Sequence, residues 1–192
     1  MRIITALISS LILVSVVSGT LAQTDPTREV QARYAECNAL EKIEKPLEFQ
    51  RRQEGNDLGA WRKFESNASD VYEFMRLHFA SNRVRSVRLE ASSPSGDWSS
   101  VTTYCYRSSG TLAFQFQTLR TFLHSQEGTS VLEVELRSYF SPNGKNFKRL
   151  EKMMDSQSKK VVKTSYMNMP APNFPTSSSV VKAVGEKLLP AK

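Results

Sequence analysis

Histidine is the side chain that acid–base catalysis at neutral pH most often uses, and this chain of 192 residues has two, His78 and His124. A serine hydrolase would need one of them as its general base. The patterns G-x-S-x-G, H-E-x-x-H, G-x-G-x-x-G and the P-loop do not occur in the sequence. His78 falls in an apolar run with helical spacing and His124 at a strand end, so we expect structural or surface roles. Active sites that arise by convergence leave no linear motif, so the sequence does not exclude an enzyme. It predicts no catalytic residue.

Cys37 and Cys105 are the two cysteines of the chain. No C-x-x-C pattern is present, which argues against a redox motif or a zinc knuckle. In an exported protein, oxidising conditions favour a disulfide between two such residues. We therefore predict that Cys37 and Cys105 form a disulfide that ties a helix to a strand; the alternative is two buried free thiols that pack as small apolar side chains.

A basic region lies between positions 145 and 163, where seven cations outnumber Glu151 and Asp155 for a local net charge of +5. The candidate contacts for an anionic ligand are Lys145, Lys148, Arg149, Lys152, Lys159, Lys160 and Lys163. Such a region can attract an anionic envelope component, lipid headgroups or nucleic acid. Nucleic acid is the least favoured because the aromatic RNP pattern is missing and the chain is predicted to be exported. The ordinary alternative is a solvated surface.

Four methionines near this region, Met153, Met154, Met167 and Met169, raise the question of a Cu(I) site, because thioether sulfur suits that ion. No histidine accompanies them, and methionine also fills gaps in protein cores. The sequence therefore predicts no metal and no cofactor.

The N-terminus predicts export. Met1-Arg2 precede an uncharged run over 3–17, and Thr20-Leu21-Ala22 is a small-x-small cleavage site, which together are typical of a secretory signal peptide. The run is shorter than the roughly 20 residues that span a bilayer. We expect residues 1–22 to be the signal peptide, 23–169 a single domain, 170–192 a Pro/Ser-rich tail, and the product to be secreted or periplasmic, with no transmembrane segment in the mature chain.

Helical signals dominate the first third of the mature chain. Asp25 is a good N-cap and Pro26 suits the first helical position, while Pro46 should end the element. One apolar stripe runs along this helix through Val30, Tyr34, Cys37, Leu40 and Ile43. Two further helices are predicted at 58–64 and 68–79.

The period changes to two after Asn82, which indicates strands. The predicted strands are 87–91, 98–106, 112–117 and 132–137, and 147–154 fits either a fifth strand or a helical turn. The tail from Pro170 is predicted to be extended, with 180–189 either docked as a short helix or mobile. The expected fold is α+β: an antiparallel meander of four or five strands with the N-terminal helices packed on one face.

The middle of the chain also carries a resemblance. Residues 93–98 read Ser-Pro-Ser-Gly-Asp-Trp, 104–107 read Tyr-Cys-Tyr-Arg, and 110–113 read Gly-Thr-Leu-Ala. This order resembles a group of small uncharacterised secreted bacterial proteins, in which a second aromatic strand end precedes a Gly-Lys turn, as 139–145 does here. The resemblance implies no activity and no catalytic residue. Ser109 stands where those proteins tend to have an acidic residue, which weakens any ligand role for that loop.

These observations favour a non-catalytic function. We expect an exported soluble binding or interaction module whose ligand is unknown; the alternatives are a small envelope hydrolase and an inhibitor of a foreign enzyme. A cleft that holds a histidine beside Ser and Asp would favour the hydrolase, and a rigid protruding loop would favour the inhibitor. The expected partner is an anionic envelope component or another exported protein.

Overall fold

The computed structural model describes residues 25–43, 45–55, 57–66, 70–125, 128–164, 166 and 171–189, with the backbone alone at 123–125 and 128–129. The predicted signal peptide, together with Met167 and Met169, lies outside these ranges. Helix α1 spans Pro26–Ile43, and the Thr27 backbone N–H donates to Asp25 Oδ1 over 2.9 Å. The predicted N-cap and the start of the helix are therefore confirmed.

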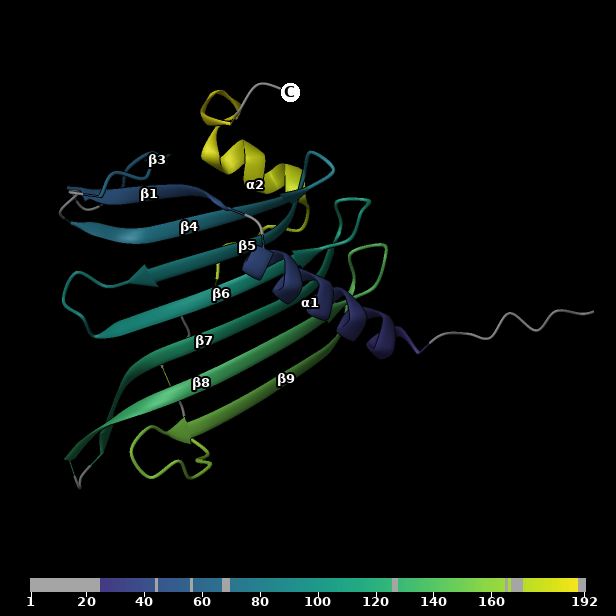
Figure 1. Ribbon diagram of the computed structural model, residues 1–192. Helices are drawn as coiled ribbons and strands as arrows, with labels where there is room; N and C mark the ends of the chain where they lie inside the picture. Colours follow the sequence, from purple (N-terminus) through teal and green to yellow (C-terminus); the bar gives the residue numbers. More distant parts are fainter. Residues whose placement is uncertain are drawn as a thin grey trace, which may run out of the picture.

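The described strands form one antiparallel sheet of nine strands in the order β2-β1-β4-β5-β6-β7-β8-β9, with β3 also pairing with β1. The strands are β1 Leu47–Glu54, β2 Asp57–Leu58, β3 Arg62–Lys63, β4 Val71–Ala80, β5 Arg83–Ser92, β6 Trp98–Tyr106, β7 Leu112–Ser125, β8 Gly128–Phe140 and β9 Asn146–Asp155. From β4 to β9 each strand pairs with the next along the chain, so most of the sheet is a meander (Figure 1).

The expected fold class was wrong in two respects. The sheet has nine strands rather than four or five, and α1 is the one helix of the described N-terminal region. The two further helices predicted at 58–64 and 68–79 are wrong: the first segment contains Leu58 of β2 and the short strand β3, and the described part of the second contains β4 from Val71 onward. In β4, Met75 and Leu77 are buried on one face and His78 on the other, because both faces are covered. Apolar residues on both faces imitated helical spacing. The segment 147–154, which fitted two interpretations, is strand β9.

The two faces of the sheet are covered by different segments. On the face toward the viewer in Figure 1, α1 crosses β5 to β8 and packs on Cys105, Phe114 and Tyr139. The opposite face carries the larger core, in which Phe174 and Val180 from the C-terminal part of the chain pack against the sheet. A third cluster on that opposite face consists of Leu119 of β7 and Leu132, Val134 and Leu136 of β8.

The C-terminal segment is fixed by named hydrogen bonds. Tyr104 Oη donates to the Pro172 carbonyl over 2.7 Å, and Tyr106 Oη donates to the Phe174 carbonyl over 3.0 Å. Helix α2, Ser177–Val184, begins at a capping box formed by Thr176. Residues 171–175 lie in neither a helix nor a strand, and α2 docks on the sheet, which was one of the two alternatives for the C-terminal segment.

Arg107 links α1 to two turns of the sheet. Its guanidinium, 9 % exposed, donates from Nε and Nη2 to the Glu29 carboxylate over 3.2 and 2.9 Å. It also donates to the Leu112 carbonyl over 2.8 Å, to the Phe140 carbonyl over 2.7 Å and to the Ser141 carbonyl over 3.3 Å. One side chain therefore holds the first turn of α1 beside the β6–β7 and β8–β9 turns.

Candidate functional site

The histidine that the structure describes in full does not form a hydrolase site. His78 is 3 % exposed and lies opposite Ser86 in the β4–β5 pairing. Ser86 is fully buried, and its hydroxyl donates to Glu41 Oε1 over 2.6 Å. His78 and Ser86 are thus both buried, and neither side chain is open to a substrate, as a hydrolase site would require. The side chain of His124 lies outside the described part of the chain.

The two cysteines come together beneath α1. Cys37 and Cys105 are both buried in one cluster with Val30, Phe114 and Tyr139. Cys37 Sγ lies 3.4 Å from the Arg85 carbonyl oxygen. Burial, and secondarily a hydrogen bond with Cys37, raises the pKa of the Cys105 thiol well above its ordinary value. In the structure both are thiols; their proximity is what the predicted disulfide requires, and the disulfide itself stays a prediction.

The predicted anionic-ligand residues do not converge on one pocket. Lys148, Arg149 and Lys152 lie on β9, the last strand of the sheet, with Lys145 in the turn before it and Lys159, Lys160 and Lys163 after it. Lys159 Nζ lies 3.2 Å from Glu133, and Lys148 Nζ lies 5.5 Å from the centre of the Tyr139 ring. These cations line an edge of the sheet. Lysines commonly occupy sheet edges because they oppose strand addition by chains that are not complementary.

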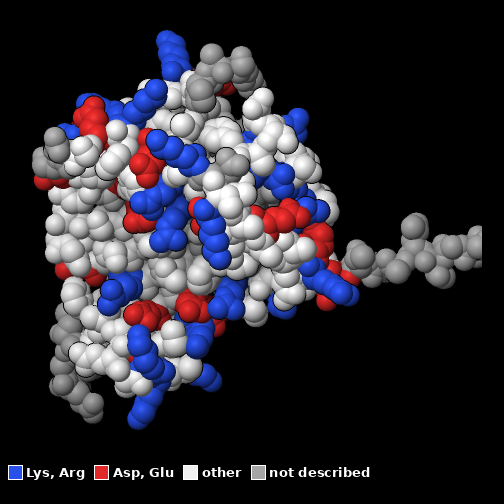
Figure 2. Space-filling model, in the orientation of Figure 1, with Lys and Arg blue, Asp and Glu red and all other residues white. Residues whose placement is uncertain are grey.

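Much of the open sheet face beside α1 is a network of opposite charges. Arg76 pairs with Glu48 over 3.2 Å and with Glu90 over 2.6 Å, and Arg88 pairs with Glu90 over 3.1 Å. Figure 2 shows cations and carboxylates interleaved across this view rather than gathered into a field of one sign. This part of the face is typical of a solvated surface.

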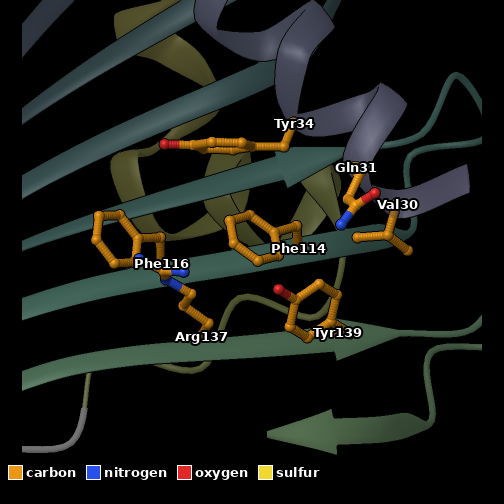
Figure 3. Close-up of a pocket in the computed structure, with 7 residues that line it drawn as sticks. All are labelled: Val30, Gln31, Tyr34, Phe114, Phe116, Arg137 and Tyr139. Atoms are coloured by element: carbon orange, nitrogen blue, oxygen red, sulfur yellow. The ribbon is translucent and has the colours of Figure 1, made fainter. Parts of the chain in front are cut away.

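The strongest candidate site is a cavity of about 290 Å³ between α1 and the β7–β8 part of the sheet. It is lined by Val30, Gln31, Tyr34, Phe114, Phe116, Arg137 and Tyr139 (Figure 3). Figure 3 shows Tyr34 reaching from α1 over the strands, with Phe114 and Phe116 below it. A helix thus forms one wall of the cavity, and two adjacent strands form the other.

The aromatic rings of the cavity contact one another. The Tyr34 and Phe114 ring centres are 4.8 Å apart, and the Phe114 and Tyr139 ring centres are 5.1 Å apart. The Arg137 guanidinium lies 5.5 Å from the centre of the Phe116 ring, and one of its nitrogens lies 3.0 Å from Glu135. The cavity is therefore apolar and aromatic inside, with a half-exposed cation at its rim.

The register of the sheet explains this arrangement. Cys105 lies opposite Phe114, Phe114 opposite Tyr139, and Tyr139 opposite Lys148. These side chains form one row across four strands, and the next row places Phe116 opposite Arg137. The sequence showed Tyr34 on the helix stripe and the two phenylalanines on one strand face. It gave no sign that Arg137, which alternates with apolar residues of β8, would stand beside them.

A second cavity of about 300 Å³ lies at the other end of the sheet and is lined by Pro46, Leu47, Glu48, Phe49, Lys63, Phe64 and Leu188. The ring of Phe64, one of its lining residues, stacks edge-on against Phe74, with centres 5.1 Å apart. The cavity beside α1 brings four aromatic rings and one cation together, and we take that one as the candidate site.

The described residues support neither a metal site nor a membrane-spanning helix. No group of three or more His, Cys, Asp or Glu side chains that could hold a metal ion occurs among them. None of the helices within the described ranges is long and apolar enough to cross a membrane. In comparisons with known proteins, no family model, curated sequence or solved structure matches the chain, so the resemblance noted for residues 93–113 stays a prediction.

Proposed function

We propose that this chain is an exported, non-catalytic binding protein whose ligand is a small molecule with an apolar body and one anionic group. The observation that carries the proposal is the cavity beside α1, in which aromatic side chains line the interior and Arg137 stands at the rim. Ligand cavities are usually concave, mostly apolar, and supplied with a few polar groups that orient the ligand. A volume of about 290 Å³ is at the small end of that class.

The charge of the ligand follows from the rim. Arg137 is the cation among the residues that line the cavity, and its guanidinium lies 5.5 Å from the centre of the Phe116 ring. A cationic ligand would meet a like charge there, whereas a carboxylate, sulfonate or phosphate would accept hydrogen bonds from the guanidinium. Glu135 already pairs with Arg137, so an anionic ligand has to compete with that carboxylate. We therefore expect moderate affinity.

A fluorescent probe tests the site directly. 8-Anilinonaphthalene-1-sulfonate has an aromatic body and one sulfonate, and its emission rises when it enters an apolar cavity. Arg137→Gln should weaken its binding about tenfold, the effect of losing one hydrogen bond to a charged group. Arg120→Gln is the matched control, because Arg120 has the same charge, lies on β7 and is not among the cavity residues. Equal weakening in both variants would show that the probe responds to surface charge alone.

A second variant tests the position of the ligand. Gln31 is an exposed residue of α1 that lines the cavity, so Gln31→Trp should fill the cavity without disturbing the core. Ala32→Trp places the same side chain on an exposed position of α1 that does not line it. Binding should be lost in the first variant and retained in the second. Retention in both would place the probe elsewhere and contradict the proposal.

A further inference from the structure

The edge of the sheet at β9 has the properties of a docking site for an extended peptide. Residues 146–152 of β9 are exposed, and Phe147 and Leu150 among them are large apolar side chains with 38 % and 43 % exposure. On its inner side β9 pairs with β8 from Asn146 to Asp155. On its outer side, within the part of the chain that the structure describes, backbone hydrogen bonds join Met153 and Asp155 of β9 to Lys159, Lys160 and Val162.

Those bonds reveal which backbone groups point outward. The Val162 N–H donates to the Met153 carbonyl over 3.1 Å, and the Asp155 N–H donates to the Lys160 carbonyl over 3.0 Å. In an antiparallel strand, alternate residues direct both backbone groups to the same neighbour. Since Met153 and Asp155 face outward, Glu151 and Arg149 also direct their N–H and C=O groups to the outer edge.

Strand β8, the inner neighbour of β9, shows which side chains pair well with this strand. On the inner side, Glu135 of β8 lies opposite Lys152. Strand β8 alternates apolar residues with Glu133 and Glu135, and β9 accepts it along its whole length. Lys148, Leu150 and Lys152 are alternate residues of β9, so their side chains project from the same face of the strand. A chain that paired with the outer edge of β9 would therefore meet a cation, an apolar residue and a second cation in that order.

From this geometry we infer that β9 adds an extended, acidic peptide segment of another protein as a further strand of the sheet. Strand addition of this kind takes its affinity from backbone hydrogen bonds and its specificity from alternate side chains. A second copy of this chain does not fit, because antiparallel pairing of β9 with itself sets like charges opposite each other in each central register. About Leu150, Lys148 of one copy would meet Lys152 of the other; about Arg149 or Glu151, that residue would meet its own copy. Like charges placed directly opposite are destabilising.

The first test separates backbone pairing from charge. The probe is a synthetic peptide that copies residues 130–136, an alternating apolar and acidic sequence, and binding is measured by fluorescence anisotropy. Arg149→Pro removes an outward N–H and leaves the inward bonds of β9 intact, and proline is tolerated at such edge positions. Arg149→Ala removes the same charge but keeps the N–H. We expect Arg149→Pro to weaken binding about tenfold more than Arg149→Ala. Equal affinities of the two variants, or no binding by the unaltered protein, would overturn the inference.

The second test does not depend on how a proline variant folds. The double change Lys148→Glu and Lys152→Glu should abolish binding of the acidic peptide and create binding of the same peptide with lysine in place of both glutamates. A diffuse electrostatic attraction would also reverse, so each pairing is repeated with a peptide of scrambled order and equal charge. The scrambled peptide should bind at least about tenfold more weakly, and equal binding would overturn the inference. Binding of anilinonaphthalenesulfonate by Arg149→Pro should be unchanged, because Arg149 does not line the cavity.

Discussion

The contact between Arg107 and Glu29 should decide whether α1 stays on the sheet. Arg107 is 9 % exposed and donates to the Glu29 carboxylate and to three backbone carbonyls. Arg107→Met keeps most of the side-chain volume but leaves those acceptors without their cation. Removing one partner of a buried ion pair costs about 3–5 kcal/mol. Glu29 is 31 % exposed and can regain water, so we expect the lower end, about 3 kcal/mol.

The assay is urea unfolding followed by circular dichroism, with calorimetry for the melting temperature. For a domain of this size, about 3 kcal/mol corresponds to a fall of about 6–12 °C. Arg33→Met is the matched control, because Arg33 also contacts Glu29, at 3.5 Å, but is 36 % exposed. Exposed ion pairs contribute about 0–1 kcal/mol. If the two variants lost the same stability, the reasoning about the buried guanidinium would be refuted.

The pH dependence gives an independent check on the same contact. The hydrogen bond from Arg107 lowers the pKa of Glu29, so at acid pH the unfolded chain binds a proton that the folded chain resists. The stability contributed by this pair is complete above the unfolded pKa and is lost as the pH falls through the lowered folded pKa. The difference in unfolding free energy between the unaltered protein and Arg107→Met should therefore shrink as the pH falls. A difference that stayed constant would contradict the assignment.

Three further predictions concern other parts of the chain. If Cys37 and Cys105 form a disulfide, the oxidised mature protein should gain the mass of two hydrogens on reduction, and an unchanged mass would mean two free thiols. Cys37→Ser should then lower the free energy of unfolding by about 4 kcal/mol, which is the chain-entropy value for a loop of 68 residues. Gly110→Ala should loosen α2, because Gly110 has φ 88° and a Cβ there would lie 2.8 Å from Ser177 Oγ; hydrogen exchange in 177–184 that matched the unaltered protein would refute this. N-terminal sequencing of the exported product should begin at Gln23, and a chain that began at Met1 would not have been processed.

The parts of the fold that the sequence predicted well are those with a single local cause. The N-cap at Asp25 and the strands with one buried face each depend on a few neighbouring residues. The Gly-Lys turn noted within 139–145 is equally local, since the Gly144 N–H donates to the Ser141 carbonyl over 2.9 Å. Strand β4 was misread because its two covered faces depend on α1 and on the C-terminal segment, and neither is visible in a local window.

The candidate site was out of reach of the sequence for a related reason. Its residues come from positions 30–34, 114–116 and 137–139, and their proximity depends on the register of β7 with β8 and on where α1 lies. The basic region was visible in the sequence as a run of charge and was interpreted as a contact for an anionic ligand. The structure shows that this run lies on and beside β9, the last strand of the sheet. A charge run on an edge strand bears on which chains can pair with it, whereas the same run on a helix would be a solvated face.

One row of side chains connects the features described above. Across β6 to β9 it runs from Cys105 through Phe114 and Tyr139 to Lys148, and α1 crosses it. The helix is held at its first turn by Arg107 and, about one turn beyond the cavity, by the packing of Cys37. The cavity wall contributed by α1 lies between these two points, so the cavity is formed before any ligand arrives. A pre-formed site loses little conformational entropy on binding, and this is the physical reason for proposing that a cavity of this small volume binds a ligand oriented by Arg137.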